Sequence, residues 1–110
     1  MNDFEKINDR FRFRAYDKES KQFKYSIQNN SFFTSYLLND RFIIQQCTGI
    51  KDKNGHLIYE GDVLELATYK VAVVWRDGSF RLKSNCCDIS LDIVRAEQCV
   101  IKGDIFINKN

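Results

Sequence analysis

The sequence predicts a mainly β protein of the β-rich α+β class. An N-terminal hairpin region is expected to precede a small SH3-like barrel or partly open β-barrel, with at most one or two short helices. Three observations predict this fold: polar and apolar side chains alternate over short runs, turn dipeptides separate the runs, and 14% of the residues are aromatic, which suits a thin β core. At 110 residues the chain has the length of one compact domain.

The chain is expected to have three stretches: a loosely ordered lead over residues 1–10, a β-rich region over 11–46 and a barrel region over 47–110. In the β-rich region, two runs with period-two alternation on either side of a polar turn predict a hairpin over residues 11–27. The secondary structure of residues 31–38 is ambiguous, because their apolar side chains fit one face of a helix and their residue types also favour a strand.

Turn dipeptides define the hairpins of the barrel region. The strongest is Asn54-Gly55, which predicts a type I′ turn with positive φ at both residues. Two further turns are expected later in the chain, and turn chemistry alone accounts for their residue types. The residues assigned to structural turns are Asn54, Gly55, Glu60, Gly61, Asp62, Asp77 and Gly78.

Strands are expected over residues 41–47, over 71–75 with a return strand after the Asp-Gly turn, and over 99–107 with a bulge or bend at Gly103. Residues 84–88 are polar and are expected to form a loop. A single helical turn is expected to begin at Ser90, which would act as its N-cap.

The charge balance argues against a strong nucleic-acid binder, because 17 basic and 15 acidic residues are interspersed and the net charge is only +2. No apolar run approaches the length of a membrane span, and the polar start is unlike a signal peptide. We therefore expect an intracellular protein without membrane contact. Disulfides are then not expected among the cysteines, which are Cys47, Cys86, Cys87 and Cys99.

Three segments carry a family resemblance. Residues 13–21, FRAYDKESK, resemble an FRAWD-type opening, and residues 46–63, QCTGIKDKNGHLIYEGDV, resemble the pattern QyTGlkDknGkeIYEGDiv. The tail, VIKGDIFIN, is similar to viGNIyeN with one inserted lysine. These patterns are those of the YopX-like family of phage and prophage proteins. The resemblance covers residues 12–108 and implies a small phage-encoded β-rich protein of the bacterial host cytoplasm, with no catalytic residues to transfer.

The sequence predicts no metal, cofactor or catalytic residue. Zinc sites need paired cysteines with matching partners, but Cys86 and Cys87 are adjacent and His56 is the only histidine. Buried or incidental thiols explain the cysteines better than a metal site, a redox site or a Cys–His nucleophile. The carboxylates of Glu60 and Asp62 are expected in a solvated turn, where they would not serve as a general acid and base. We therefore expect a protein that is not an enzyme.

Arg10, Arg12 and Arg14 are expected on one strand face, as a ladder with a spacing of roughly 6.6–7 Å. With nearby aromatic rings, this ladder would suit single-stranded nucleic acid. A solvated face, an edge that charge protects from aggregation, and a contact for an acidic protein are the alternatives. The candidate contact residues are Arg10, Arg12, Arg14, Tyr16, Tyr25 and Trp75.

The leading functional hypothesis is a non-enzymatic, macromolecule-binding accessory protein of a phage or prophage, whose partner is a host or phage protein. Direct nucleic-acid binding through the arginine face is the alternative, and a small enzyme without a recognisable motif is the third. Exposed strand edges also favour a homo-oligomer.

Overall fold

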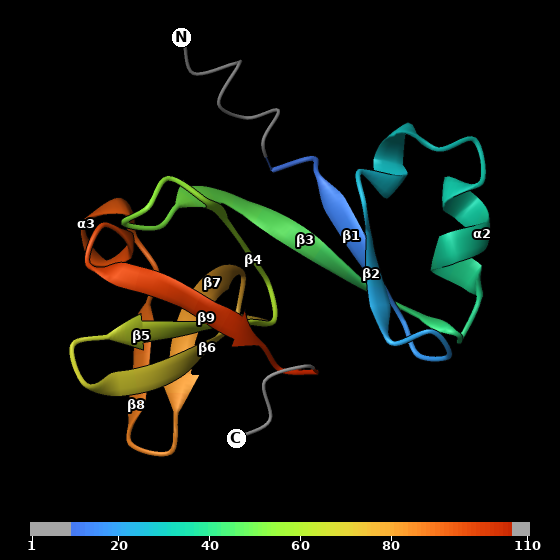
Figure 1. The fold of residues 1–110 in the computed structure, drawn as a ribbon. Coiled ribbons are helices and arrows are strands. Elements are labelled where there is room, and N and C mark those ends of the chain that lie inside the picture. The colour runs from blue at the N-terminus through green and yellow to red at the C-terminus, as the bar shows by residue number, and fades with distance from the viewer. Residues whose placement is uncertain (1–9, 107–110) are drawn as a thin grey trace, which may run out of the picture. The chain divides into compact units, whose positions relative to one another are not determined.

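A computed structural model describes residues 10–106 of the chain (Figure 1). These residues divide into two compact units, and the division falls between Gly49 and Ile50. It lies inside a strand, a few residues after the boundary at 46/47 expected from the sequence. Most of the predicted N-terminal lead, residues 1–9, lies outside the described residues.

The first unit is a small sheet with two short helices. Strand β1 lies between β2 and β3 and pairs antiparallel with both, so the hairpin predicted over residues 11–27 is confirmed. The ambiguous segment 31–38 contains a helix, and the strand expected over 41–47 forms and continues further. The elements are β1 (Phe13–Asp17), β2 (Gln22–Tyr25), the 3-10 helix η1 (Ile27–Asn29), α2 (Phe33–Leu38) and β3 (Phe42–Lys51).

Aromatic contacts hold α2 in place. A helix of six residues is not stable by itself in water. The ring of Phe33 lies 5.6 Å from that of Phe13 in β1, and the ring of Tyr36 lies 4.8 Å from that of Phe42 in β3, edge to face. Tertiary packing therefore decides in favour of a helix where the residue types alone were ambiguous.

An ion pair joins the β1–β2 turn to the start of β3. The Arg41 guanidinium donates from Nε and Nη2 to the two carboxylate oxygens of the buried Asp17, both at 2.7 Å. The same carboxylate accepts the N–H of Glu19 within the turn. The guanidinium of Arg41 holds the pKa of Asp17 well below its usual range.

The second unit is built on a five-stranded antiparallel sheet in the order β8-β7-β6-β5-β9, and its strands curl around a common core (Figure 1). The β-rich, barrel-like fold predicted from the sequence is confirmed. Strand β4 neighbours β3 in the first sheet. The elements are β4 (Leu57–Tyr59), β5 (Asp62–Leu66), β6 (Tyr69–Arg76), β7 (Ser79–Ser84), β8 (Cys87–Ser90), α3 (Ile93–Ala96) and β9 (Cys99–Asp104).

The core of this unit follows the period-two pattern of its strands. Val71 and Val73 share the inner face of β6, and Leu82 of β7 lies opposite Val73 in register. Leu64 of β5 lies opposite Val71. All four side chains are buried. Trp75 continues the same face of β6 beyond this core, where it is half exposed.

Two local expectations for residues 84–92 are wrong. The predicted loop over 84–88 contains the start of strand β8, which begins at Cys87. The predicted N-cap is also displaced. Ser90 ends β8, and Asp92 caps α3 instead, because its Oδ1 accepts the N–H of Arg95 at 2.8 Å.

The bulge predicted at Gly103 is confirmed. Val63 pairs with Gly103 but Leu64 pairs with Ile101, so Lys102 is the extra residue on β9. Gly103 itself has φ 151°.

Two predicted turns differ in geometry. Asp77 and Gly78 have φ 55° and 81°, the positive pair that a type I′ hairpin requires. At the first turn only Gly55 is positive, with φ 83°, so the type I′ expectation for Asn54-Gly55 is wrong. Instead, the N–H of Gly55 bonds the carbonyl of Asp52 at 3.0 Å, which places the turn one residue earlier.

Candidate interaction surface

The arginine ladder expected on one strand face does not form. Strand β1 begins after Arg12, so Arg10 and Arg12 precede it and are exposed. Arg14 is only 4% exposed. Its Nε donates to Gln45 Oε1 at 2.8 Å, and its guanidinium lies 4.3 Å from the centre of the Phe23 ring. The third arginine is therefore engaged within the unit instead of pointing to solvent.

The three aromatic residues predicted as contacts lie in different environments. Tyr16 is buried, with its ring 5.2 Å from that of Phe23. Tyr25 is exposed at the end of β2. Trp75 belongs to the second unit, where its exposed ring meets Phe80 edge to face at 4.7 Å. The six predicted contact residues thus include two that are buried, Arg14 and Tyr16.

The family-like segment 46–63 contains a buried carboxylate with a structural role. Asp52 is 5% exposed. Its Oδ1 accepts the N–H groups of Asn54 and His56, both at 2.9 Å, and its Oδ2 accepts the N–H of Ile101 at 3.0 Å. Burial raises the pKa of Asp52, but these three hydrogen bonds lower it by more, so the net shift is downward. Asp52 therefore joins the turn before β4 to strand β9.

The Glu60-Gly61-Asp62 turn is structural, but the expectation that it is solvated is wrong. Asp62 is buried, and its Oδ2 accepts the N–H of Tyr59 at 2.7 Å. Gly61 has φ 88°, and its backbone bonds both Val73 and Ile105. Its positive φ favours glycine at this buried position.

The four cysteines are free, and they fall into two classes. Cys47 and Cys99 are fully buried, and burial together with the negative charge of Asp52 raises the pKa of Cys99. Cys86 is exposed and Cys87 is half buried. Between residues 10 and 106 no three potential metal ligands cluster.

A mainly apolar pocket lies beside the second pair of cysteines. It has a volume of about 370 Å³ and is lined by Leu66, Tyr69, Val71, Cys86 and Cys87. Adjacent strand residues ordinarily point to opposite faces, but Cys86 lies in the β7–β8 turn and both cysteines border this pocket.

Helix α2 and its N-cap residue Phe32 carry several exposed apolar side chains. None of its six residues is buried. Phe32, Leu37 and Leu38 are 67%, 53% and 80% exposed. Single apolar residues on a surface are ordinary, so what distinguishes this helix is that it and its N-cap carry three of them.

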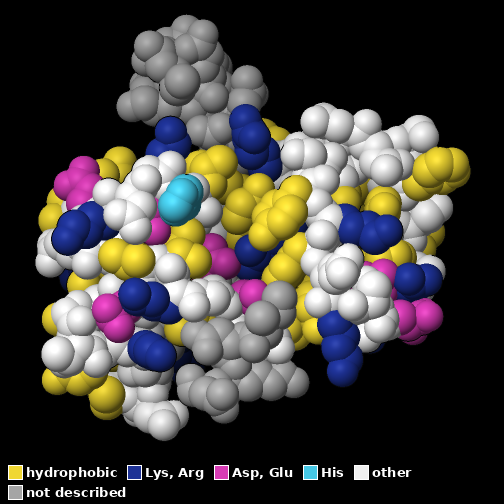
Figure 2. All heavy atoms as spheres, viewed as in Figure 1, with side chains coloured by type: hydrophobic (Ala, Val, Ile, Leu, Met, Phe, Trp, Pro, Cys, Tyr) yellow, Lys and Arg dark blue, Asp and Glu magenta, His cyan; other side chains and the backbone are white. Residues whose placement is uncertain are grey.

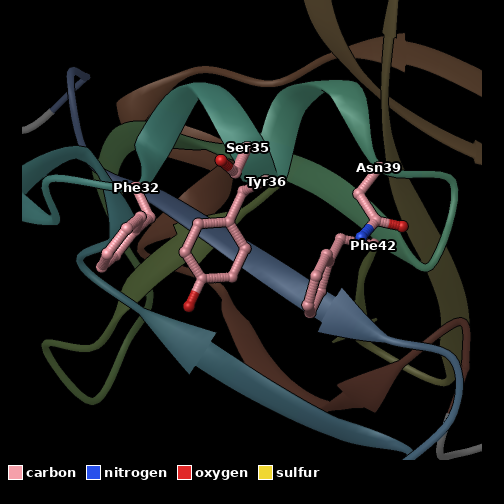
Figure 3. Close-up of a pocket in the computed structure, with 5 residues that line it drawn as sticks. All are labelled: Phe32, Ser35, Tyr36, Asn39 and Phe42. Atoms are coloured by element: carbon pink, nitrogen blue, oxygen red, sulfur yellow. The ribbon is translucent and has the colours of Figure 1, made fainter.

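An open pocket runs along the same helix. Figure 3 shows the rings of Phe32, Tyr36 and Phe42 in a row beside α2, with the Tyr36 hydroxyl pointing away from the helix. The pocket has a volume of about 250 Å³. We use the name α2 surface for the residues that line this pocket together with the exposed Leu37 and Leu38, which do not line it. Its members are Phe32, Ser35, Tyr36, Leu37, Leu38, Asn39 and Phe42.

A signal for the α2 surface is present in the sequence, although it is not a motif. Residues 25–39 contain no Asp, Glu, Lys, Arg or His, in a chain that is 29% charged. In Figure 2, uncharged and hydrophobic atoms reach the surface over η1 and α2, at the upper right of the view. Charged residues ordinarily occupy much of the solvent-exposed surface. Their absence from fifteen consecutive residues therefore distinguishes this segment from the rest of the chain.

These features define a small two-unit protein of barrel-like β architecture with an apolar helical surface. The sequence profile of the YopX protein family matches residues 8–110. The chain therefore belongs to the YopX family, as its motifs indicated. It is similar in fold to the crystal structure of protein EF1440 from Enterococcus faecalis, with a TM-score of 0.62 and 20% identity over 90% of this chain and 95% of that chain. No curated protein matches it. In the described part of the chain, no helix has the length and apolar character needed to cross a membrane.

Proposed function

We propose that this YopX-family protein is a non-enzymatic accessory protein of a phage or prophage that binds another protein in the bacterial cytoplasm. The observation that carries the proposal is the α2 surface, where Phe32, Leu37 and Leu38 are mostly exposed. Aromatic side chains are enriched in protein interfaces, and covering exposed apolar side chains of any kind is favourable. The four free cysteines suit a reducing compartment.

The family motifs have a structural role, which is consistent with placing the binding function elsewhere, on the α2 surface. The carboxylates of Asp52 and Asp62 accept hydrogen bonds from backbone N–H groups inside the second unit. Both carboxylates therefore stabilise the fold of this unit. Within the α2 surface, the ring contact between Tyr36 and Phe42 holds the helix in place. The exposed Phe32, Leu37 and Leu38 have no such structural role among the described residues.

Affinity capture tests the proposal. The tagged parent chain is compared with the double variant Phe32→Ser/Leu38→Ser, and bound proteins and nucleic acids are identified in the same eluate. The matched control is Ile93→Ser/Val94→Ser, which removes two similarly exposed apolar side chains from α3. We expect a partner that the parent and the control retain and the α2 variant loses. Equal retention by all three would contradict the proposal.

A second candidate function is nucleic-acid binding through the run Arg10-Phe11-Arg12. These three consecutive residues are all exposed, and they combine two guanidiniums with an aromatic ring. The test is fluorescence anisotropy with single-stranded oligonucleotides at low salt, comparing the parent with Arg10→Ala/Arg12→Ala and with the exposed control Lys70→Ala. Arg14 is left in place because it is buried. Absence of binding by the parent at low salt removes this candidate.

A further inference from the structure

We propose that Asn54 is a site of spontaneous covalent modification, where the side-chain amide converts to aspartate and isoaspartate, and that Asp52 sets the rate by holding the surrounding turn closed. The inference is independent of the α2 surface and of any partner. It rests on the exposed Asn54-Gly55 pair, the open space around Gly55 and the hydrogen bonds of the turn.

The reaction needs only water and the residues of the turn. The backbone nitrogen of Gly55 gives its proton to hydroxide and attacks Cγ of Asn54. A carbon–nitrogen bond forms, and the departing amide group takes a proton from water and leaves as ammonia, so a succinimide ring results and hydroxide is regenerated. Water then opens the ring. Opening at Cγ gives aspartate, and opening at the main-chain carbonyl gives isoaspartate, whose backbone runs through Cβ and Cγ.

The sequence and the surroundings favour this reaction at one place. Asn54-Gly55 is the only Asn-Gly pair in the chain. Both residues are exposed, and no atom lies within 4 Å of the position that a Cβ at residue 55 would take. Because glycine has no side chain, residue 55 does not shield its own nitrogen from the amide of Asn54.

The folded turn opposes the reaction. All five backbone N–H groups of residues 52–56 donate hydrogen bonds. The N–H of Gly55, whose proton must leave first, donates to the carbonyl of Asp52 at 3.0 Å. The N–H groups on either side, of Asn54 and His56, donate to Oδ1 of Asp52, both at 2.9 Å. The other two donate to backbone carbonyls, one of them in β9. We therefore expect the reaction to proceed from the opened turn.

The carboxylate of Asp52 determines how often the turn opens. Opening separates the N–H groups of Asn54 and His56 from a charged acceptor. One hydrogen bond to a charged group corresponds to a factor of about ten in the population of the opened turn. Conversion in the folded chain should therefore be at least about tenfold slower than in the unfolded chain.

The isoaspartate product should weaken the link between the turn and β9. It adds one carbon to the main chain between residues 54 and 55. The Asp52 carboxylate bridges the N–H groups of Asn54, His56 and Ile101, and the longer main chain displaces His56 from Asn54. The aspartate product keeps the main chain as it is.

Peptide mapping of the full chain by mass spectrometry provides the test, at mildly alkaline pH, in native buffer and in urea that unfolds the chain. The tryptic peptide 54–70 has one amide side chain, that of Asn54, so its mass gain reports the conversion. We expect conversion in urea, and conversion at least about tenfold slower in native buffer. The control Asn54→Gln, which would need a larger ring, should gain no mass. Absence of conversion in urea, or equal rates in the two conditions, overturns the inference.

Asp52→Ala tests the role of the carboxylate, with Leu82→Ala as the matched control, because Leu82 is buried in β7 in the core of the same unit. Both are compared with the parent in native buffer, at a temperature where circular dichroism shows all three folded. We expect conversion at least about tenfold faster in Asp52→Ala and close to the parent rate in Leu82→Ala. A parent-like rate in Asp52→Ala, or equal acceleration in both variants, contradicts control by Asp52. Should Asp52→Ala fail to fold, the comparison of the parent in buffer and urea decides.

The isolated product tests the structural consequence. Ion exchange separates the isoaspartate form from the parent, and urea denaturation compares it with the variant Asn54→Asp, which has the same charge and a normal main chain. We expect the isoaspartate form to unfold at a lower urea concentration than Asn54→Asp. Equal midpoints would refute the weakened link to β9.

Discussion

Replacing Asp52 by Asn should destabilise the second unit strongly, although it changes only one atom of the side chain. The carboxylate accepts three backbone N–H groups on two oxygens while 5% exposed. An amide has only one oxygen. If that oxygen keeps the bonds to Asn54 and His56, the amide nitrogen faces the N–H of Ile101, and two donors oppose each other in a buried place.

The expected loss in the free energy of unfolding follows from the hydrogen bond that the Ile101 N–H loses. A hydrogen bond to a charged group contributes about 1.5–3 kcal/mol, and leaving the partner unsatisfied adds to the loss. We expect Asp52→Asn to lower the free energy of unfolding by about 2–3 kcal/mol. For a protein of this size, that corresponds to a fall in Tm of roughly 8–20 °C.

The assay is urea and thermal denaturation followed by circular dichroism, with Asp77→Asn as the matched control. Asp77 is 85% exposed and has φ 55° in a turn that also accepts Asn. The control should therefore change stability by less than about 0.5 kcal/mol. Equal stability of the two variants would refute the reasoning about Asp52.

The pH dependence gives a second check on Asp52. Its pKa is lower in the folded chain than its unfolded value of about 3.9. A depressed carboxylate pKa stabilises the fold above the unfolded pKa, and this contribution is lost as pH falls through the folded pKa. The stability difference between the parent and Asp52→Asn should be complete at neutral pH and shrink below about pH 4. A difference that stays constant down to pH 2 would contradict the charge-based account.

Further expectations concern the core, one turn and the thiols. Leu82→Ala should cost about 2–5 kcal/mol in urea denaturation, because Leu82 is fully buried in the main core; a cost below about 1 kcal/mol would argue against that packing. Gly55→Ala should cost about 1–2 kcal/mol in the same assay, because φ is 83° while no atom lies within 4 Å of the added carbon, so backbone strain alone acts. With a thiol reagent under native conditions, Cys86 should react fast and the buried Cys47 and Cys99 only after unfolding, as mass spectrometry of the labelled peptides would show. Fast labelling of Cys47 would contradict its burial.

Local signals predicted much of the fold. Asp77-Gly78 adopts its expected turn because the two residues themselves tolerate positive φ. The Asn54-Gly55 turn departs from its expected type because the Asp52 carboxylate takes the N–H groups on either side of Gly55. The third partner of that carboxylate, Ile101, is 49 residues away, and no local pattern indicates it.

The candidate contact residues show a second limit of prediction from the sequence, which concerns burial. Period-two alternation separates the side chains of β1 into two faces, but it does not tell that both faces are covered, as the burial of residues 14–17 shows. The charge of Arg14 predicts a solvent-facing side chain, yet it lies against Phe23 and Gln45. The helix α2 depends on ring contacts with Phe13 and Phe42, which are distant in sequence. The uncharged stretch over 25–39 was the one visible sign of the α2 surface.

The most direct test of the central claim, that the α2 surface is a protein contact surface, is photocrosslinking from within it. Phe32 is replaced by p-benzoylphenylalanine in cells that express the chain, and the same replacement at Ile93 in α3 serves as the control, because both side chains are largely exposed. We expect protein adducts of discrete mass from position 32 and none from position 93. Adducts of equal yield from both positions, or from position 93 alone, would contradict it.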